Sequence, residues 1–358
     1  MSGIYGALGL ADGQRVMLSA LGQEVVFDAM QQVLGDHNDD LLRAASVFVE
    51  EVTDTYKKRY MLPGGGYLQE VGENTTPGTT KAYGSWDVAF PLRNMADGLS
   101  INDIAFAYMT SEELARHVDA ITMRDTRTVR KAILDALFNN AQDTFVDPIW
   151  GSLSIEPLAN SDTATYPPVE GSASEATEDH YLSSGYAVAA ISDTNNPYAT
   201  VADELEEHFG AAQGGGNIVA FIPTATVATT RALTDFVPVS QLGIRPGDDT
   251  AQVVGLPANM PGRVIGRMDG SGVWVVEWRW IPATYLLALH LDAPKPLIQR
   301  IDPADTGLGQ GLQLVAREAK QPFTTAYYRH RFGFGCGNRL NGVAMIVSAA
   351  AYSVPTIS

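Results

Sequence analysis

Cys336 and His330 are the pair of residues in this sequence that comes nearest to a nucleophile with its general base, because an imidazole can deprotonate a nearby thiol. Cys336 is the only cysteine of the chain and stands in the segment Gly-Phe-Gly-Cys-Gly. A lone cysteine in such surroundings is typical of a small buried side chain. The sequence therefore predicts a core residue at Cys336, with an enzyme site around Cys336 and His330 as the weaker alternative.

Histidine and carboxylate residues give no recognisable metal-binding pattern. The six histidines are scattered, and neither Glu207 with His208 nor His290 with Asp292 has the spacing of an HExxH helix or of grouped ligands. A single cysteine also excludes a zinc site built from several thiolates of one chain. We therefore expect no metal ion.

Glycine-rich and aromatic stretches do not predict a nucleotide site either. The stretches 214–216 and 307–311 lack a strand-to-helix context and are not followed by Lys-Ser or Lys-Thr. Trp274, Trp278 and Trp280 could stack on the bases of single-stranded nucleic acid, but they alternate along one predicted strand and so share its inward face. The sequence predicts no cofactor and no catalytic residues.

Five side chains on a predicted hairpin are the candidate intersubunit contacts. Lys57, Lys58 and Arg59 lie on one extended stretch and Lys81 and Trp86 on the other, with Gly- and Pro-rich sequence between them. An isolated two-stranded ribbon is marginal in water, so we expect this one to rest on another polypeptide. Lys57, Lys58 and Arg59 could contact a phosphate, but an acidic surface of a neighbouring subunit suits them better.

A long amphipathic helix over residues 111–140 is the element around which the rest is organised. Apolar residues recur along it at spacings of three and four. Thr110 followed by Glu113 predicts a capping box at its start. The apolar stripe is interrupted at residues 124–126, which argues against a coiled coil. At about 1.5 Å per residue the rod would be about 45 Å long.

The remaining elements are expected in a mixed order. Helical spacing predicts one helix over residues 16–34, ending at Gly35, and a second over residues 39–52. The stretch 152–184 is rich in Ser, Thr, Asp, Glu and Pro, which is typical of a loop.

Helices and strands alternate from residue 186, and strands dominate after residue 312. Within the first of these parts we expect helices over 197–209 and 224–236, and strands over 217–222, 273–280 and 285–291. This mixture predicts an α+β protein.

Composition limits the partners of the protein. The hydrophobic content of 45% is typical of a folded globular chain, and the formal net charge is −17. Between residues 151 and 250 fourteen acidic residues stand against only Arg231 and Arg245. Sequence-specific DNA binding needs clustered positive charge, so we do not expect it. The sequence has no run of eighteen apolar residues and no signal peptide, so we expect no membrane partner and synthesis in the cytoplasm.

This order of parts resembles the major capsid protein of tailed bacteriophages, which has the Hong Kong 97 fold, over essentially the whole chain. Three stretches look most like that family: AYGSWDVAFPLRNMADGLS before the long helix, TEDHYLSSGY before the second subdomain and FGFGCGNRLNGVAMIVSAAAY near the end. None of these is a catalytic signature, so the resemblance rests on the order of the elements along the chain and on the general residue pattern of these stretches.

The resemblance implies a division of this α+β chain into four parts. These are an N-terminal arm 1–52, an extended loop (hairpin) 53–100, a peripheral domain 101–185 and 303–358 with spine helix 111–140, and an axial domain 186–302. The loop would lie over an adjacent subunit, which explains a polar ribbon that is marginal on its own. The arm would be shared between subunits in the same way.

The implied function is structural and not enzymatic. Many copies would assemble as homo-hexamers and homo-pentamers into an icosahedral shell that encloses packaged double-stranded DNA without sequence-specific binding. The resemblance implies a virion location after assembly in the host cytoplasm, with a portal and decoration proteins as further partners. We also expect a separate scaffolding protein and no N-terminal trimming. Lys81 with Asn338 or Asn341 could form a cross-link, but noncovalent assembly is the expectation.

An encapsulin-like nanocompartment is the main alternative to a phage shell. It shares the fold and encloses enzymes in place of DNA. A cargo-peptide groove on the inner face would distinguish it, and the sequence does not reveal one.

Overall fold

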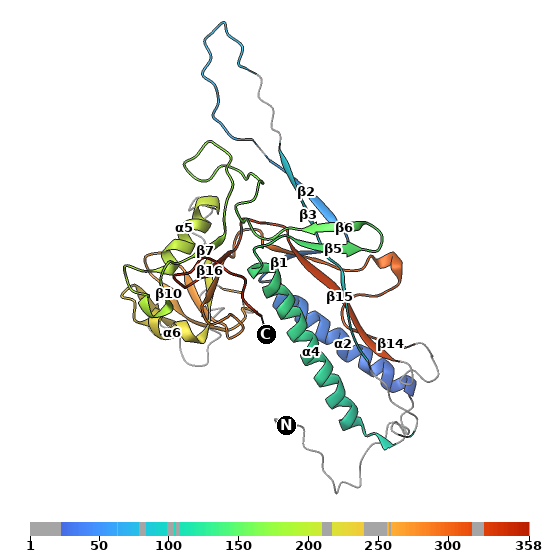
Figure 1. Cartoon of the computed structure of the whole chain (residues 1–358). Helices are drawn as coiled ribbons and strands as arrows, with labels where there is room; N and C mark the ends of the chain where they lie inside the picture. The colour runs from blue at the N-terminus through green and yellow to red at the C-terminus, as the bar shows by residue number, and fades with distance from the viewer. Residues whose placement is uncertain are drawn as a thin grey trace. The chain divides into compact units, whose positions relative to one another are not determined.

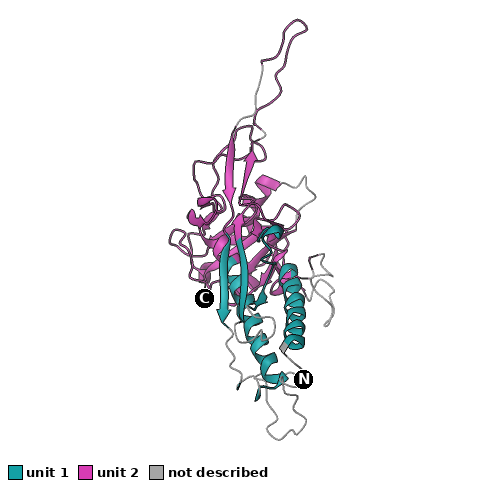
Figure 2. Cartoon of the chain, turned by 90° about the vertical axis from the view of Figure 1, so that its right-hand side faces the viewer, with its two compact units in different colours: residues 1–43, 92–132, 301–333 teal, residues 44–91, 133–300, 334–358 magenta. Residues whose placement is uncertain are grey.

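The computed structural model of the protein describes residues 23–62, 64–78, 84–98, 104, 108–209, 217–239, 256–257, 259–316 and 326–357. The chain folds as two compact units (Figure 2). Unit 1 comprises residues 1–43, 92–132 and 301–333, and unit 2 comprises residues 44–91, 133–300 and 334–358. No helix among the described residues has both the length and the apolar content to cross a bilayer.

Unit 1 packs two helices against a small antiparallel sheet. It contains β4 (Arg93–Gly98), the 3-10 turn η4 (Ala304–Thr306), β14 (Gln313–Val315) and the larger parts of α2 (Gln23–Ala45), α4 (Ser111–Phe138) and β15 (Tyr327–Cys336), whose last residues belong to unit 2. The central strand β15 pairs with β4 and with β14. Apolar side chains of both helices and of the sheet form one buried cluster, which includes Met30, Leu34, Leu114, Val118 and Tyr328.

Helix α4 confirms the long helix expected over residues 111–140. Its capping box is present, because the Glu113 N–H donates to Thr110 Oγ1 at 3.3 Å and the Thr110 N–H donates to the Glu113 carboxylate at 3.0 Å. Two otherwise unpaired backbone donors of the first turn are thereby satisfied. The helix begins where the sequence pattern placed it.

The two helices expected over residues 16–34 and 39–52 are wrong in their boundaries. One helix, α2, runs through Gly35 to Ala45, and the strand β1 (Val49–Thr53) follows. A glycine inside a helix costs only about 1 kcal/mol, which burial of α2's apolar face can offset. Residues 49–53 are extended because β1 pairs in parallel with β13 (Leu297–Arg300), a partner far away in sequence. Residues before 23 lie outside the described part of the chain.

Unit 2 contains two hairpins. In the first, β2 (Lys57–Met61) pairs with β3 (Ser85–Ala89), so that the predicted ribbon is confirmed with a shorter second strand. In the second, β5 (Asp143–Asp147) pairs with β6 (Gly151–Ile155). Strand β6, together with β7 at residues 181–183, corrects the expectation of a loop over the whole stretch 152–184. Bulky side chains at alternate positions of β6 reach a buried cluster with Ala89.

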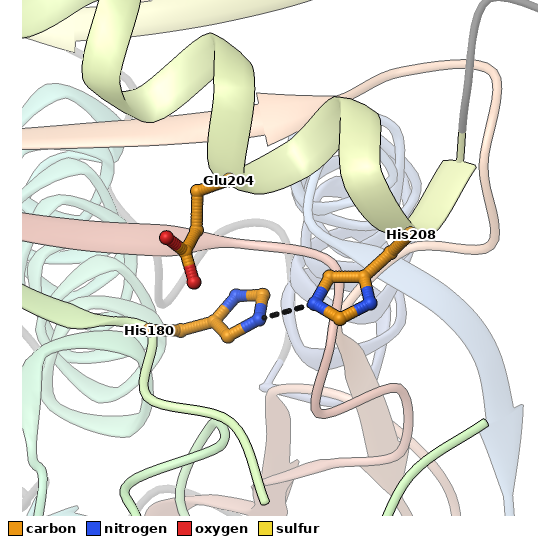
Figure 3. Close-up of side chains that lie close together, drawn as sticks. All are labelled: His180, Glu204 and His208. Carbon is orange, nitrogen blue, oxygen red and sulfur yellow. Dashed lines mark hydrogen bonds between the residues drawn. The ribbon is translucent and has the colours of Figure 1, made fainter. Parts of the chain in front are cut away.

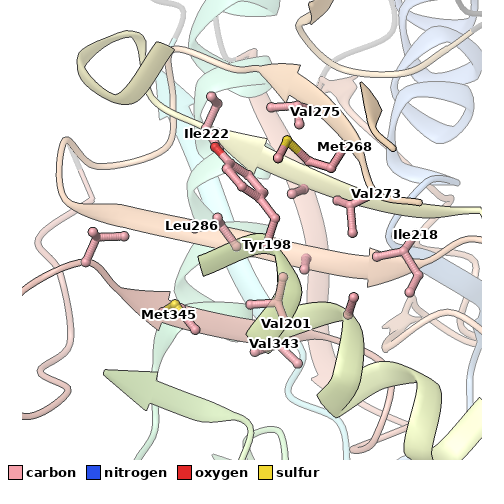
Figure 4. Packing of buried hydrophobic residues seen from close by; sticks show 14 of the residues in the cluster. Tyr198, Val201, Ile218, Ile222, Met268, Val273, Val275, Leu286, Val343 and Met345 are labelled. Atoms are coloured by element: carbon pink, nitrogen blue, oxygen red, sulfur yellow. The ribbon is translucent and has the colours of Figure 1, made fainter. Parts of the chain in front are cut away.

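The core of unit 2 is a mixed seven-stranded sheet in the order β7-β16-β12-β8-β11-β10-β9. The strands are β7 (Tyr181–Ser183), β8 (Ile218–Ile222), β9 (Phe236–Pro238), β10 (Arg263–Met268), β11 (Trp274–Glu277), β12 (Tyr285–His290) and β16 (Val343–Ile346). The other elements are the 3-10 turn η1 (Val188–Ala190) and the helices α5 (Pro197–Phe209) and α6 (Thr224–Arg231). Figure 4 shows α5 packing Tyr198 and Val201 into the apolar cluster on this sheet.

Most of the elements expected in this region are confirmed, with two corrections. The strand expected over 273–280 ends at Glu277, and all four residues of β11 are buried, so the expected alternation with Glu277 on the outward face is wrong. The helix expected over 224–236 ends at Arg231, and β9 begins at Phe236 because residues 236–238 pair with β10. Trp274 and Trp278 are buried, as the core interpretation predicted, and Trp280 is half-buried. The central strands β8 and β12 are buried on both faces and read as continuous apolar runs.

Candidate functional site

The three basic candidate contacts on β2 already have partners in their own chain. Lys57 Nζ lies 2.6 Å from an Asp87 oxygen, and Arg59 donates from Nε and Nη2 to the two Asp87 oxygens at 2.6 and 2.9 Å. Lys58 forms an ion pair with Glu51. Hydrogen bonds from Arg59 and Lys57 lower the pKa of Asp87. These pairs are solvent-exposed, so each stabilises the hairpin only slightly.

Trp86 is packed within unit 2 and is not a free surface residue. Its ring stacks on Tyr60 with centroids 5.4 Å apart and meets the edge of Tyr166, also at 5.4 Å. Arg59 by contrast keeps 65% of its side chain exposed and can still reach another surface. Lys81, the fifth candidate, lies outside the described residues. The role of all five as intersubunit contacts remains a prediction.

The segment that joins β2 to β3 carries exposed apolar side chains. Figure 1 shows it extending beyond the ends of both strands. Residues 64–78 have no helix or strand, and Tyr67 is 82% exposed and Leu68 is fully exposed. Met61 and Val71 are exposed too. Contiguous apolar exposure on an extended segment indicates a surface that binds another molecule. This segment, residues 61–78, is called the β2–β3 loop below.

Glycines turn the chain into the β2–β3 loop. Gly64 and Gly66 have positive φ angles of 81° and 105°, which favour glycine. A Cβ atom on Gly65 would lie 2.4 Å from the carbonyl oxygen of Ala173. The neighbouring Gly66 N–H donates to that same oxygen at 2.8 Å. The backbone therefore requires glycine at each of the three positions 64, 65 and 66.

Cys336 and His330 have separate structural roles. Cys336 is buried, its thiol donates to the Ala136 carbonyl oxygen at 3.6 Å, and burial raises the pKa of the thiol to about 12. His330 is hydrogen bonded through Nδ1 to Asp125 at 2.7 Å. A thiol so strongly protonated is a poor nucleophile. The interpretation of Cys336 as a core residue is confirmed.

A cluster of histidines and carboxylates in unit 2 was missed by the sequence analysis. Figure 3 shows His180, which immediately precedes β7, facing Glu204 and His208 of α5. His180 Nε2 and His208 Nε2 are 3.2 Å apart. Glu204 and His208 share one face of the helix because they are four residues apart. That spacing is a sequence signal, but His180 is too distant in the chain to be added by pattern alone.

Burial sets the charge state of this cluster. Burial lowers the pKa of His180 to about 3 and of His208 to about 4, so both imidazoles are neutral at pH 7. Burial, with the nearby charges of Glu207 and Glu178, raises the pKa of Glu204 to about 7. The group therefore offers neutral nitrogen ligands beside a carboxyl that a positive charge would ionise.

Comparisons with known proteins show the fold. No family model matches the chain, and no curated protein matches it. A solved structure titled "Mycobacterium phage Patience" is 18% identical and covers 97% of this chain and 97% of its own, with a TM-score of 0.68.

Two more distant structures have TM-scores of 0.48 and 0.47. They are titled "Capsid of empty GTA particle computed with C5 symmetry" and "Asymmetric unit of bacteriophage PhiM1 mature capsid". They are 11% and 9% identical and cover 86% and 83% of this chain, and 90% and 84% of their own. The phage Patience likeness, which spans both chains almost from end to end, carries the conclusion. This α+β chain shares the fold of the phage Patience structure, and the Hong Kong 97-like fold that the sequence resemblance implied is confirmed.

Proposed function

We propose that the protein is the major capsid protein of a tailed bacteriophage. Copies of it would assemble as hexamers and pentamers into an icosahedral shell around packaged double-stranded DNA. The observation that carries this proposal is the β2–β3 loop, whose apolar side chains Tyr67 and Leu68 have no cover in their own chain. The fold shared with a phage structure supports assembly into a shell, in which a neighbouring subunit would cover such a loop.

The parts of the chain would take the roles that the resemblance implies. Residues 1–52 would be the shared arm, 53–100 the extended loop, 101–185 with 303–358 the peripheral domain, and 186–302 the axial domain. Lys57, Lys58, Arg59, Lys81 and Trp86 would lie at or near the contact between subunits. The acidic excess of residues 151–250 supports an electrostatic partner for the basic side chains.

The proposed role is structural, without catalysis and without base-specific DNA contacts. A net charge of −17 suits a shell protein that does not bind the packaged DNA tightly, because DNA is also negatively charged. A scaffolding protein, a portal and decoration proteins are the further partners in this proposal, and the virion is the proposed location. Noncovalent assembly is supported by Asn341, whose side-chain amide is fully buried and donates to the carbonyl oxygens of His290 and Pro294.

Sedimentation of the purified protein tests the proposal. The protein is run at high concentration, alone and after co-expression with its neighbouring genes, and the fast fraction is examined by electron microscopy. Closed shells, or rings of five and six subunits, are expected. A protein that stays monomeric under both conditions contradicts the proposal.

The contents of native particles separate a phage shell from a nanocompartment. We expect an absorbance ratio typical of packed DNA, and nuclease protection of that DNA. Shells from the native source that hold a protein cargo and no DNA would instead establish the nanocompartment alternative.

A further inference from the structure

Two imidazoles in unit 2 are arranged as a pair of ligands. His180 Nδ1 lies 2.9 Å from the Gly342 carbonyl oxygen. A carbonyl can only accept, so Nδ1 carries the proton and the Nε2 lone pair can accept a hydrogen bond or bind a metal ion. This is the arrangement found in metal-ligating histidines, whose other ring nitrogen donates to a carbonyl or carboxylate. The His180 Nε2 atom faces Nε2 of His208 at 3.2 Å and, without an ion, accepts a hydrogen bond from it.

The spacing of the two nitrogens suits a tetrahedral metal ion. Zinc–nitrogen bonds are about 2.0–2.1 Å long, so two imidazoles on one tetrahedral ion have nitrogens about 3.3–3.4 Å apart. The Nε2 atoms of His180 and His208 are 3.2 Å apart. The His208 side chain is only 2% exposed. Small adjustments of two side chains would admit the ion.

Carboxylates complete the coordination sphere. One oxygen of Glu204 and the imidazole nitrogens of His180 and His208 all lie within 4.8 Å of one another. A Glu207 oxygen is 3.6 Å from His208 Nε2, and Glu178, Glu204 and Glu207 form with His208 a second, overlapping group that does not include His180. Figure 3 shows the Glu204 carboxylate beside the His180 ring. Two imidazoles and one or two carboxylates are a typical ligand set for zinc.

The position of His180 is fixed by the backbone. Its N–H donates to the Ala159 carbonyl oxygen at 2.8 Å, and its own carbonyl accepts from the Ala344 N–H at 2.9 Å. A ligand held in this way needs little ordering when an ion binds. Glu204 and His208 are held by α5, whose apolar face is buried in the core of unit 2.

We propose that His180, Glu204 and His208 bind a divalent transition-metal ion of the zinc type. The ion would link α5 to the segment before β7 and stabilise this part of unit 2. Such a site does not depend on shell assembly, so a test of metal binding is separate from a test of the proposed function. The raised pKa of Glu204 agrees with it, because a cation would compensate the buried negative charge.

Metal titration of untagged protein tests the site. The full chain is stripped with a chelator and titrated with Co²⁺, whose visible spectrum reports tetrahedral coordination, and then with Zn²⁺ in competition. We expect one ion per chain and a higher unfolding temperature with Zn²⁺, because the ion binds only the folded state. Absence of binding by the wild-type chain would overturn the proposal.

Matched variants locate the ion. His208→Gln and Glu204→Gln should each weaken Zn²⁺ binding by more than about tenfold. Mutation of a residue that only hydrogen bonds to a metal ligand already costs about tenfold in affinity, and loss of a ligand itself should cost more. Glu206→Gln, which removes an exposed carboxylate from the same helix, should bind like the wild type. Equal binding by His208→Gln and the wild type would contradict the site.

X-ray absorption at the zinc edge needs no variant and so does not depend on how the variants fold. It should show nitrogen and oxygen ligands, including imidazole, and no sulfur. Sulfur in the coordination shell would place the ion at Cys336, the only cysteine, and would overturn the assignment.

Discussion

Asp125 of α4 and His330 of β15 are joined by a buried hydrogen bond, with 2.7 Å between Oδ1 and Nδ1. The other carboxylate oxygen of Asp125 lies 3.1 Å from Nε2 of His37 in α2. Asp125 thus links three elements of unit 1 that come from distant parts of the chain. It occupies the gap in the apolar stripe at residues 124–126, so that gap marks a buried polar contact.

Asp125→Asn should lower the free energy of unfolding by about 1–3 kcal/mol, because an amide cannot accept hydrogen bonds from both imidazoles at once. Chemical unfolding at pH 7 measures the change. Asp119→Asn, at an exposed position of the same helix, is the control and should change stability by less than about 0.5 kcal/mol. Equal free energies of unfolding for the two variants would show that the Asp125 hydrogen bonds make no net contribution to stability.

The Asp125 contribution should also depend on pH. Burial raises the pKa of Asp125, but hydrogen bonds from His330 and His37 together with their charges outweigh burial, so the native pKa lies below the ordinary value. Such a carboxylate stabilises the fold at pH above about 4, and this contribution is lost as pH falls through the native pKa. The difference between wild type and Asp125→Asn should therefore shrink on acidification. A difference that widens below pH 4 would contradict this reasoning.

Leu68→Gln should impair assembly while it leaves the subunit intact. The side chain is fully exposed in its own chain, and burying a leucine at an interface is worth about 1.5–3 kcal/mol. Each contact should weaken by about tenfold or more, so the shell fraction in sedimentation should fall steeply. Met123→Gln, an exposed apolar position on α4, is the matched control. An unchanged shell fraction for Leu68→Gln would exclude the β2–β3 loop as a subunit contact.

Arg339→Met should destabilise the protein by about 3 kcal/mol or more. The Arg339 guanidinium is buried and donates to the carbonyl oxygens of Pro157 and Leu158 at 2.7 and 3.2 Å, and to Asp162 at 2.7 Å. Methionine fills part of the volume but leaves these acceptors unsatisfied. Thermal unfolding beside the exposed control Arg127→Met measures the loss. A similar melting temperature for both variants would refute this role.

Cys336 should resist thiol reagents until the protein unfolds. Its thiol is buried, and its pKa is raised to about 12, so almost no thiolate exists at pH 8. The reaction rate with a disulfide reagent should rise by orders of magnitude in denaturant. Cys336→Ala should change stability by only about 1 kcal/mol. Rapid labelling of the native protein would reopen the thiol-nucleophile alternative.

Local patterns in the sequence predicted the elements that depend on local interactions. Helix α4 begins with a capping box of Thr110 and Glu113, and the spacing of these two residues is visible in the sequence itself. The β2–β3 hairpin is marked by alternation on both sides of a Gly-rich turn. The apolar runs of β8 and β12 are continuous because both faces are buried. In each case the information lies within a few residues.

Features that depend on distant partners were not predicted. Residues 49–53 read as helical, but parallel pairing with residues 297–300 makes them a strand. Gly35 reads as a helix end, although α2 continues past it. His180 meets His208 only because α5 packs beside β7 and β16 in the folded sheet. No pattern along the chain reports these encounters.

The place of β16 in the seven-stranded sheet has a consequence for biosynthesis. This strand lies between β7 and β12 but comes from residues 343–346, close to the end of the chain. Contacts between residues so far apart in sequence form slowly and only after both partners have been synthesised. A ribosome must therefore translate at least as far as residue 346 before the seven-stranded sheet of unit 2 can form. Until then β7 and β12 lack the strand that lies between them, so their facing edges stay unpaired in the nascent chain.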